Sequence, residues 1–189
     1  MHFSLRPFSV PRKNLGFSLP EILIVVVILG ILATTAISIS AQELRRNKVQ
    51  KAANTLVGWL DSAARAAQRG QGCLVSIPST TVTTGNSAAT IQSDTTTTPS
   101  SVIVNQCSLI GNLFFDNISD GSSFSITTAP VSSIVFTPRG TIFNPADPSG
   151  NFGQNIRVTI NVFQAGSAQP PSACVLITPP LGQIRAERC

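Results

Sequence analysis

Few residues in this chain of 189 residues are of the types that catalyse reactions or bind metals. The single histidine is His2, and the four cysteines show no Cys-x-x-C spacing. A zinc site needs clustered Cys or His ligands, and a Ser-His-Asp triad needs a histidine within the fold. The stretch 116–121 is typical of a turn rather than of an EF-hand calcium loop. The sequence therefore predicts a protein that is not an enzyme, with no catalytic residues, no metal site and no cofactor.

Three arginines late in the chain, Arg139, Arg185 and Arg188, are candidates for contact with the phosphates of DNA. The alternative is that they make hydrogen bonds or ion pairs within the fold. The formal net charge of +5 does not decide between the two, because residues 1–16 hold three bases and no acid, which leaves +2 for the rest. Charge alone therefore does not predict nucleic-acid binding.

Glu21 is a lone carboxylate that precedes a long apolar run. Residues 22–41 carry no charge over 20 positions, and a helix of that length spans about 30 Å, enough for a bilayer core. A buried core helix is the alternative, whereas a secretory signal peptide has a shorter apolar region. Ser18 and Glu21 also fit a helix capping box. The sequence predicts one membrane span, with the basic residues 1–16 on the cytoplasmic side and the C-terminal part across the membrane.

The segment Gly16-Phe17-Ser18-Leu19-Pro20-Glu21, followed by the apolar run, resembles the class III signal of type IV prepilins and type II secretion pseudopilins. The resemblance implies cleavage between Gly16 and Phe17 by prepilin peptidase, and N-methylation of Phe17. It also implies that Glu21 pairs with the N-terminal amine of a neighbouring subunit. Two opposite charges in a low-dielectric bundle are each costly alone and tolerable together. The implied partners are other pilins, prepilin peptidase, the inner-membrane assembly platform, and membrane lipid before assembly.

The resemblance, together with the changes in composition, implies four segments. Residues 1–16 form the leader, 17–42 the transmembrane and filament-core helix, 43–72 its amphipathic continuation, and 73–189 a β-rich domain. Apolar residues between Val49 and Ala67 recur every three or four positions, which predicts one apolar helix face. Residues 43–69 carry six bases and two acids, which indicates a solvated face or, alternatively, part of a polyanion-binding surface.

From Cys73 onward, short apolar stretches are separated by Gly, Pro, Ser and Asn, which is typical of strands and turns. The predicted strands are 73–77, 101–105, 108–115, 123–127, 133–137, 156–163, 174–178 and 183–188. Residues 79–101 hold 14 Ser or Thr in 23 positions, so a loop or a locally disordered insertion is expected there.

The four cysteines form an even set in a domain that is expected to leave the cytoplasm. Disulfides persist in oxidising compartments, and three pairings of four cysteines are possible. We favour Cys73–Cys107 with Cys174–Cys189, because the second closes a hairpin around residues 179–182. Four free, buried thiols are the alternative.

Two blocks of the β-rich domain resemble recurrent blocks of the GspH/FimT-type minor pilins. They are Ile134-Val135-Phe136-Thr137-Pro138-Arg139-Gly140 and the closing stretch from Cys174 to Arg185. The resemblance implies an α+β fold, in which a long N-terminal α-helix, transmembrane in its first half, packs against an antiparallel β-sheet.

The function that these resemblances imply is that of a structural subunit. The chain is expected to be a minor pilin of a type IV pilus or a pseudopilin of a type II secretion system. It would reside in the inner membrane with its C-terminal domain in the periplasm, and then in the pilus or pseudopilus. The alternative is a DNA-binding minor pilin for natural transformation, in which a basic Gly-Arg-x-Arg turn contacts DNA. Here that turn is Gly182-Gln183-Ile184-Arg185, so the first arginine is replaced.

Overall fold

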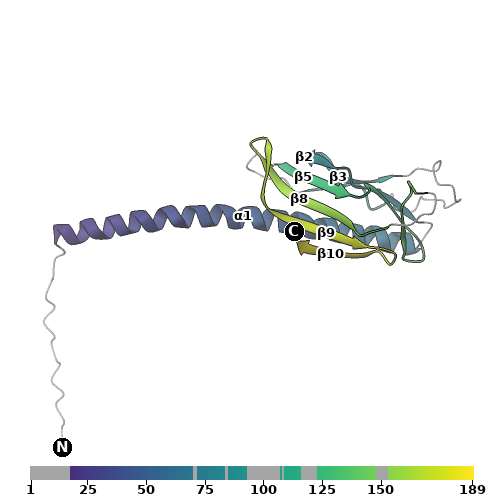
Figure 1. Cartoon of the computed structure of the whole chain (residues 1–189), viewed down its shortest axis with the longest axis horizontal. Coiled ribbons are helices and arrows are strands. Elements are labelled where there is room, and N and C mark those ends of the chain that lie inside the picture. The colour runs from purple at the N-terminus through teal and green to yellow at the C-terminus, as the bar shows by residue number, and fades with distance from the viewer. Residues whose placement is uncertain are drawn as a thin grey trace, which may run out of the picture. The chain divides into compact units, whose positions relative to one another are not determined.

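The computed structural model describes residues 18–69, 72–83, 85–92, 107, 109–115, 123–147 and 153–189, with the side chains of 34–40 outside that description. The chain forms two compact units, residues 1–41 and 42–189. Its elements, labelled in part in Figure 1, are α1 (Leu19–Arg69), β1 (Cys73–Ser76), β2 (Thr80–Val82), β3 (Ser87–Gln92), β4 (Leu113–Phe114), β5 (Ser123–Ala129), β6 (Ser133–Phe136), β7 (Ile142–Phe143), β8 (Ile156–Gln164), β9 (Ser167–Thr178) and β10 (Gln183–Arg188).

In the first unit, the described residues form the beginning of α1. The carbonyl oxygen of Ser18 accepts hydrogen bonds from the amides of Glu21 and Ile22, at 3.0 and 3.3 Å. Glu21 therefore lies in the first turn, where the positive end of the helix dipole favours an acid. The helix continues without a break through Gly30.

In the second unit, the remainder of α1 presents one apolar face to the core. The buried residues on this face are Val49, Ala52, Ala53, Leu56, Leu60, Ala63 and Ala67. The helix ends at Arg69, a base in the last turn that suits the negative end of the dipole. Gly72 then adopts a φ of 102°, a conformation that glycine reaches easily, and the chain enters β1.

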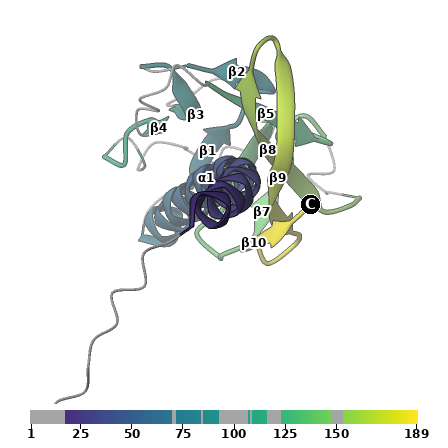
Figure 2. The same cartoon turned by 90° about the vertical axis from the view of Figure 1, so that its left-hand side faces the viewer.

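Two five-stranded sheets pack with this part of α1. Their strand orders are β4-β3-β1-β6-β7 and β10-β9-β8-β5-β2, and every strand pair in both is antiparallel. Figure 2, which looks along the helix, shows β1 on one side of it and β8, β9 and β10 on another. The fold is therefore α+β, as the sequence predicts.

A single hydrophobic cluster joins the helix to both sheets. β8 alternates strictly, burying Ile156, Val158, Ile160 and Val162 and turning the residues between them outward. Each such buried side chain contributes about 1.5–3 kcal/mol relative to an exposed one. Trp59 of α1 is nearly buried, and its indole N–H donates to the carbonyl oxygen of Gly111 at 3.1 Å. The alternation of buried and outward-facing residues in β8 therefore determines which of its side chains face solvent.

The Ser/Thr-rich segment 79–101 departs from expectation, because its described part contains two strands rather than a loop. β2 pairs with β5, and β3 pairs with β1. Small residues make this possible, since Ala88 and Ala89 of β3 are fully buried against the core. Residues 93–101 lie outside the described residues, as does the predicted strand 101–105. Composition predicts a loop here because it does not register cross-strand pairing with distant residues.

Two further strands differ in extent from the prediction. The expected strand 108–115 is reduced to β4, because residues 109–110 form a turn and only Leu113 and Phe114 pair with β3. β9 begins at Ser167, seven positions before the expected start at Cys174. Prolines at 170 and 171 hide this extension, since proline seldom lies inside a strand. The register shift opposite Asn161 and Val162 is the bulge that accommodates them.

The two sequence blocks around residues 134–140 and 174–185 meet at a corner between the sheets. The amide of Ile142 donates to the carbonyl oxygen of Pro180 at 2.9 Å, which links β7 to the turn before β10. Gly182 in that turn has a φ of 61°, and a Cβ there would lie 2.9 Å from Cγ2 of Ile142. The corner therefore requires glycine at 182 both for its backbone conformation and for space.

Candidate functional site

The apolar surface that follows Glu21 is the first candidate site. Ten large side chains among residues 22–32 are between 48% and 62% exposed. They are Ile22, Leu23, Ile24, Val25, Val26, Val27, Ile28, Leu29, Ile31 and Leu32. Apolar residues on all sides of a helix are unusual in contact with water and mark a surface that binds lipid or protein. The described helix can therefore present a continuous apolar surface with one acid at its beginning.

No helix within the described residues combines the length and apolarity that crossing a membrane requires.

Of the residues predicted to serve in processing and assembly, the structure describes one. The cleavage site between Gly16 and Phe17 lies outside the described residues. Glu21 is described, exposed, and is the only charged residue between positions 18 and 42. An exposed carboxylate on an apolar surface would be buried when that surface is covered, and burial is costly unless a cation accompanies it. The pairing role of Glu21 stays a prediction.

Both disulfides are present, in the pairing that the sequence favours. Cys73 pairs with Cys107 and Cys174 with Cys189, with Cα atoms 5.7 and 5.3 Å apart. The first lies against α1, since Sγ of Cys73 is 3.2 Å from the carbonyl oxygen of Ala63. The second ties the C-terminal residue to β9 beside the outer edge of its sheet. These bonds fix the start of β1 and the end of β10.

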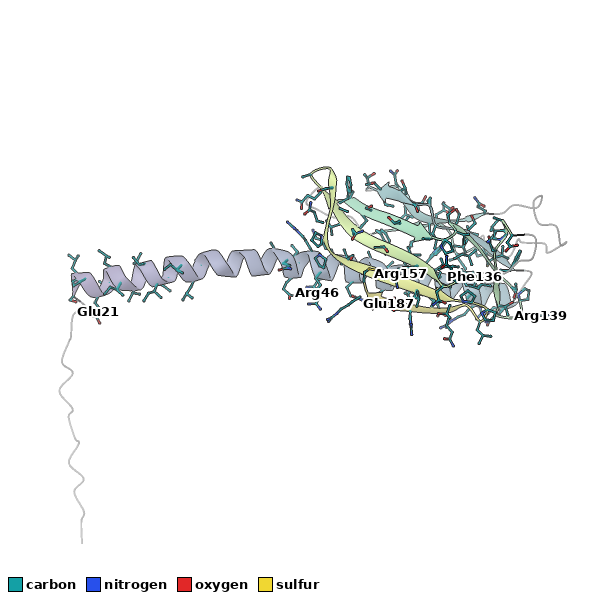
Figure 3. All side chains as sticks on the ribbon, in the orientation of Figure 1. Glu21, Arg46, Phe136, Arg139, Arg157 and Glu187 are labelled. Carbon is teal, nitrogen blue, oxygen red and sulfur yellow. A yellow bond between two sulfur atoms is a disulfide. The ribbon has the colours of Figure 1, made fainter. Side chains whose placement is uncertain are left out.

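Two of the three arginines predicted to contact DNA, Arg185 and Arg188, lie on opposite faces of one strand. Arg139 lies in the turn after β6, and Figure 3 shows it well apart from Arg157 and Glu187. Arg185 and Arg188 both belong to β10, but they are three residues apart and so point to opposite faces of the sheet. Ile184 and Ala186 pack against the core, which places Arg185 on the outer face.

The structure instead brings together two arginines and a glutamate that sequence spacing did not group. Glu187 lies between Arg185 of its own strand and Arg157 of β8. The distances are 3.7 Å from Nη2 of Arg157 to Oε1 of Glu187 and 3.9 Å from Nε of Arg185 to Oε2. Arg157 could have been assigned to an outward face from the alternation of 156–163. No feature of the sequence indicates which strands lie beside β8 in the sheet.

The described part of the chain contains no group of three or more His, Cys, Asp or Glu side chains able to hold a metal ion. Of the aspartates in the loop-like segments, Asp147 is in a turn, where its amide donates to the carbonyl oxygen of Asn144 at 3.3 Å. The segment 116–121, predicted to be a turn, lies outside the described residues, and so does Asp94.

Comparison with known proteins gives one match. Residues 11–37 match the prokaryotic N-terminal methylation motif. No curated protein and no solved structure matches the chain. The matched segment contains the predicted cleavage site, Glu21, and the whole apolar surface at residues 22–32. The chain therefore carries, at residues 11–37, the signature of type IV prepilin-like proteins.

Proposed function

We propose that this protein is a minor pilin or pseudopilin, a structural subunit of a type IV pilus or a type II secretion pseudopilus. The observation that carries the proposal is the methylation motif at residues 11–37, which contains Glu21 and the exposed apolar surface of α1 at residues 22–32. Prepilin peptidase cleaves after Gly16, and Phe17 becomes the N-methylated first residue. The short basic leader is then absent from the mature subunit.

The apolar part of α1 has two successive environments in this proposal. Before assembly it is held in the inner membrane, which covers residues 22–32, and the domain formed by 42–189 lies in the periplasm. On assembly, neighbouring subunits replace the lipid, and the assembly platform moves the subunit into the filament. Two observations support this order: the surface is apolar all round, and Glu21 stands at its beginning.

Glu21 sets the register between subunits by pairing with the amine of a neighbouring Phe17. A carboxylate and an amine that enter an apolar bundle together offset part of each other's desolvation cost. A subunit that lacks the carboxylate would leave the amine of its neighbour unpaired. Removal of one partner from a buried ion pair typically costs about 3–5 kcal/mol, which is enough to exclude most copies from a filament.

The experiment compares Glu21→Ala with Glu43→Ala in the native host. Both residues are acids on α1, but Glu43 lies beyond the apolar surface. Both variants should be cleaved and retained in the membrane fraction, whereas sheared filaments should contain much less of Glu21→Ala than of Glu43→Ala. Equal amounts of the two variants in filaments would refute the pairing role. A deletion strain, assayed separately for piliation and for protein secretion, assigns the subunit to one of the two systems.

A further inference from the structure

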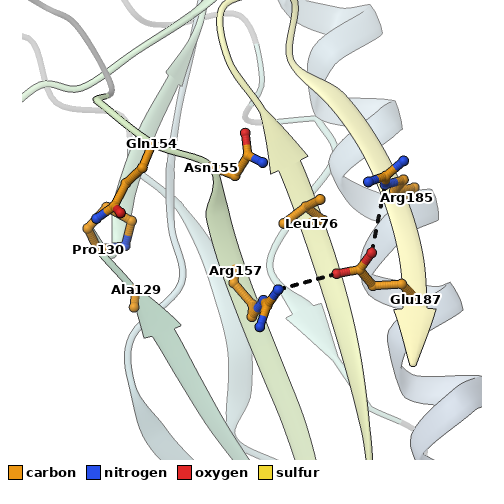
Figure 4. A pocket seen from close by; sticks show the side chains of 8 residues that line it. All are labelled: Ala129, Pro130, Gln154, Asn155, Arg157, Leu176, Arg185 and Glu187. Atoms are coloured by element: carbon orange, nitrogen blue, oxygen red, sulfur yellow. Dashed lines mark ion pairs between the residues drawn. The ribbon is translucent and has the colours of Figure 1, made fainter. Parts of the chain in front are cut away.

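The outer face of the sheet β10-β9-β8-β5-β2 carries a pocket of about 590 Å³, within the usual range of small-ligand sites. Four strands or their adjoining turns contribute to it, and its polar side chains are those of Gln154, Asn155, Arg157, Arg185 and Glu187. Figure 4 shows Glu187 between the side chains of Arg157 and Arg185, whereas Gln154 and Asn155 lie apart from these three. The structural role proposed above makes no use of this pocket.

Strand register explains why the two arginines face each other. Leu176 of β9 is the partner of Arg157 on one side and of Arg185 on the other. The two arginines therefore stand in one cross-strand row, separated by about 10 Å, which is two strand spacings. Leu176 is only 5% exposed, although it belongs to the outer face, because it lies between the stems of these long side chains. Leu176 therefore forms an apolar floor between two guanidinium groups.

Glu187 shows what kind of group this pair of arginines can hold. Its carboxylate lies within 4.0 Å of both guanidinium groups, and its side chain is 29% exposed against 59% and 68% for Arg157 and Arg185. The separations of 3.7 and 3.9 Å exceed the range of a hydrogen bond. Glu187 therefore balances the charge without taking up the N–H donors of either arginine in these two contacts. Those N–H groups can donate hydrogen bonds to the oxygens of a second carboxylate at shorter distances.

The other residues that line the pocket indicate which class of ligand fits it. None of its residues is aromatic, so the pocket offers no ring on which a nucleobase could stack. The side-chain amides of Gln154 and Asn155 can both donate and accept hydrogen bonds, which is what a peptide backbone requires. Ala129, Pro130 and Leu176 supply small apolar contacts. An extended peptide that presents an acidic side chain fits these features.

We propose that the pocket formed by Arg157, Arg185 and Asn155 is a binding site for an acidic peptide segment of a partner protein. The carboxylate of the partner accepts hydrogen bonds from the two arginines, and the like charge of Glu187 weakens its binding. This inference goes beyond the role in filament assembly and does not depend on cleavage or on Glu21. Binding of this kind should be modest in affinity and sensitive to salt, because the charges are exposed.

The test measures binding of fluorescently labelled octaglutamate to the full-length chain in non-ionic detergent, by anisotropy. Arg157→Gln and Arg185→Gln should each weaken binding by about fivefold to tenfold. Glu187→Gln should strengthen it by about threefold to tenfold, because a negative charge that repels the peptide is removed. Arg188→Gln is the matched control, since it removes the same charge from the same strand but from the opposite face, and it should change binding by less than about twofold.

Several outcomes would overturn the proposal. These are an absence of octaglutamate binding, an effect of Arg188→Gln as large as that of Arg185→Gln, or weaker binding by Glu187→Gln. Tighter binding of a short DNA duplex with the same pattern across the variants would reassign the site to phosphate. Thermal unfolding of each variant controls for misfolding. If Arg157→Gln is unstable, Arg157→Lys keeps the charge and the stem over Leu176, and it should bind less tightly than the wild type but more tightly than a charge deletion.

Discussion

Replacement of Gly182 by alanine should destabilise the β-rich domain through two separate effects. The first is conformational, because a φ of 61° costs a residue with a Cβ about 1–2 kcal/mol. The second is steric, because the new Cβ would lie 2.9 Å from Cγ2 of Ile142, closer than real Cβ atoms approach a neighbour. Overpacking of this kind typically costs about 1–3 kcal/mol. The sum, about 2–5 kcal/mol, is a large part of the stability of a single domain.

Alanine substitutions at two other glycines distinguish the conformational effect from the steric effect. Gly166, in the hairpin between β8 and β9, has a φ of 80° but open space around its Cβ position, so Gly166→Ala carries only the conformational cost. Gly58 lies in α1, also with open space, and Gly58→Ala should raise stability by about 0.5–1 kcal/mol. The three substitutions are chemically identical. Their order of stability should therefore be Gly58→Ala, wild type, Gly166→Ala and then Gly182→Ala.

Thermal unfolding of the full-length chain in detergent, followed by circular dichroism in the β-sheet region, measures this order. One kcal/mol corresponds to about 2–4 °C for a domain of this size. Gly182→Ala should therefore melt about 2–12 °C below Gly166→Ala, which is the steric contribution of about 1–3 kcal/mol alone. Equal melting temperatures for these two variants would refute the reasoning, because they would show that the contact between the turn and Ile142 does not constrain the corner.

Further predictions concern the disulfides and nucleic acid. Replacing Cys174 and Cys189 together by serine should lower the free energy of unfolding by about 3 kcal/mol in the chain-entropy model. Replacing Cys73 and Cys107 together by serine should lower it by about 4 kcal/mol, because that disulfide closes a longer loop. Denaturant titration checks both values, and intact mass after alkylation of the unreduced, denatured protein should show no modified cysteine. Because Arg185 and Arg188 lie on opposite faces of β10, duplex DNA should bind with a Kd weaker than about 10⁻⁴ M at physiological salt. A submicromolar Kd that is lost in Arg185→Gln would contradict this expectation.

The spacing of apolar residues was sufficient to predict the buried face of an element whose own periodicity determines its burial. The spacing of Val49, Leu56 and Leu60 predicts the buried face of α1, and the alternation in 156–163 predicts β8. The same spacing did not predict burial where it depends on pairing with a strand that is distant in the sequence. Ala88 and Ala89 are buried because β1 and β4 flank them, and nothing in a Ser/Thr-rich sequence indicates this pairing.

Of the candidate sites, one could be predicted from the sequence and the other could not. The methylation motif and Glu21 are contiguous in the sequence, so they could be predicted without a fold. The grouping of Arg157 with Arg185 and Glu187 depends on the register of three strands, which sequence spacing does not encode. For the same reason, Arg185 and Arg188 look like one basic cluster in the sequence but lie on opposite faces of β10.

The mass and first residue of the mature chain test the central claim most directly. Protein recovered from the membrane or filaments of its native host should begin at Phe17, with residues 1–16 removed and a methyl group on the new amine. Replacing Gly16 by leucine should leave the longer, unmethylated precursor in the membrane. A mature chain that retains Met1, or whose N-terminus lies beyond residue 30, would contradict the assignment as a prepilin-like subunit.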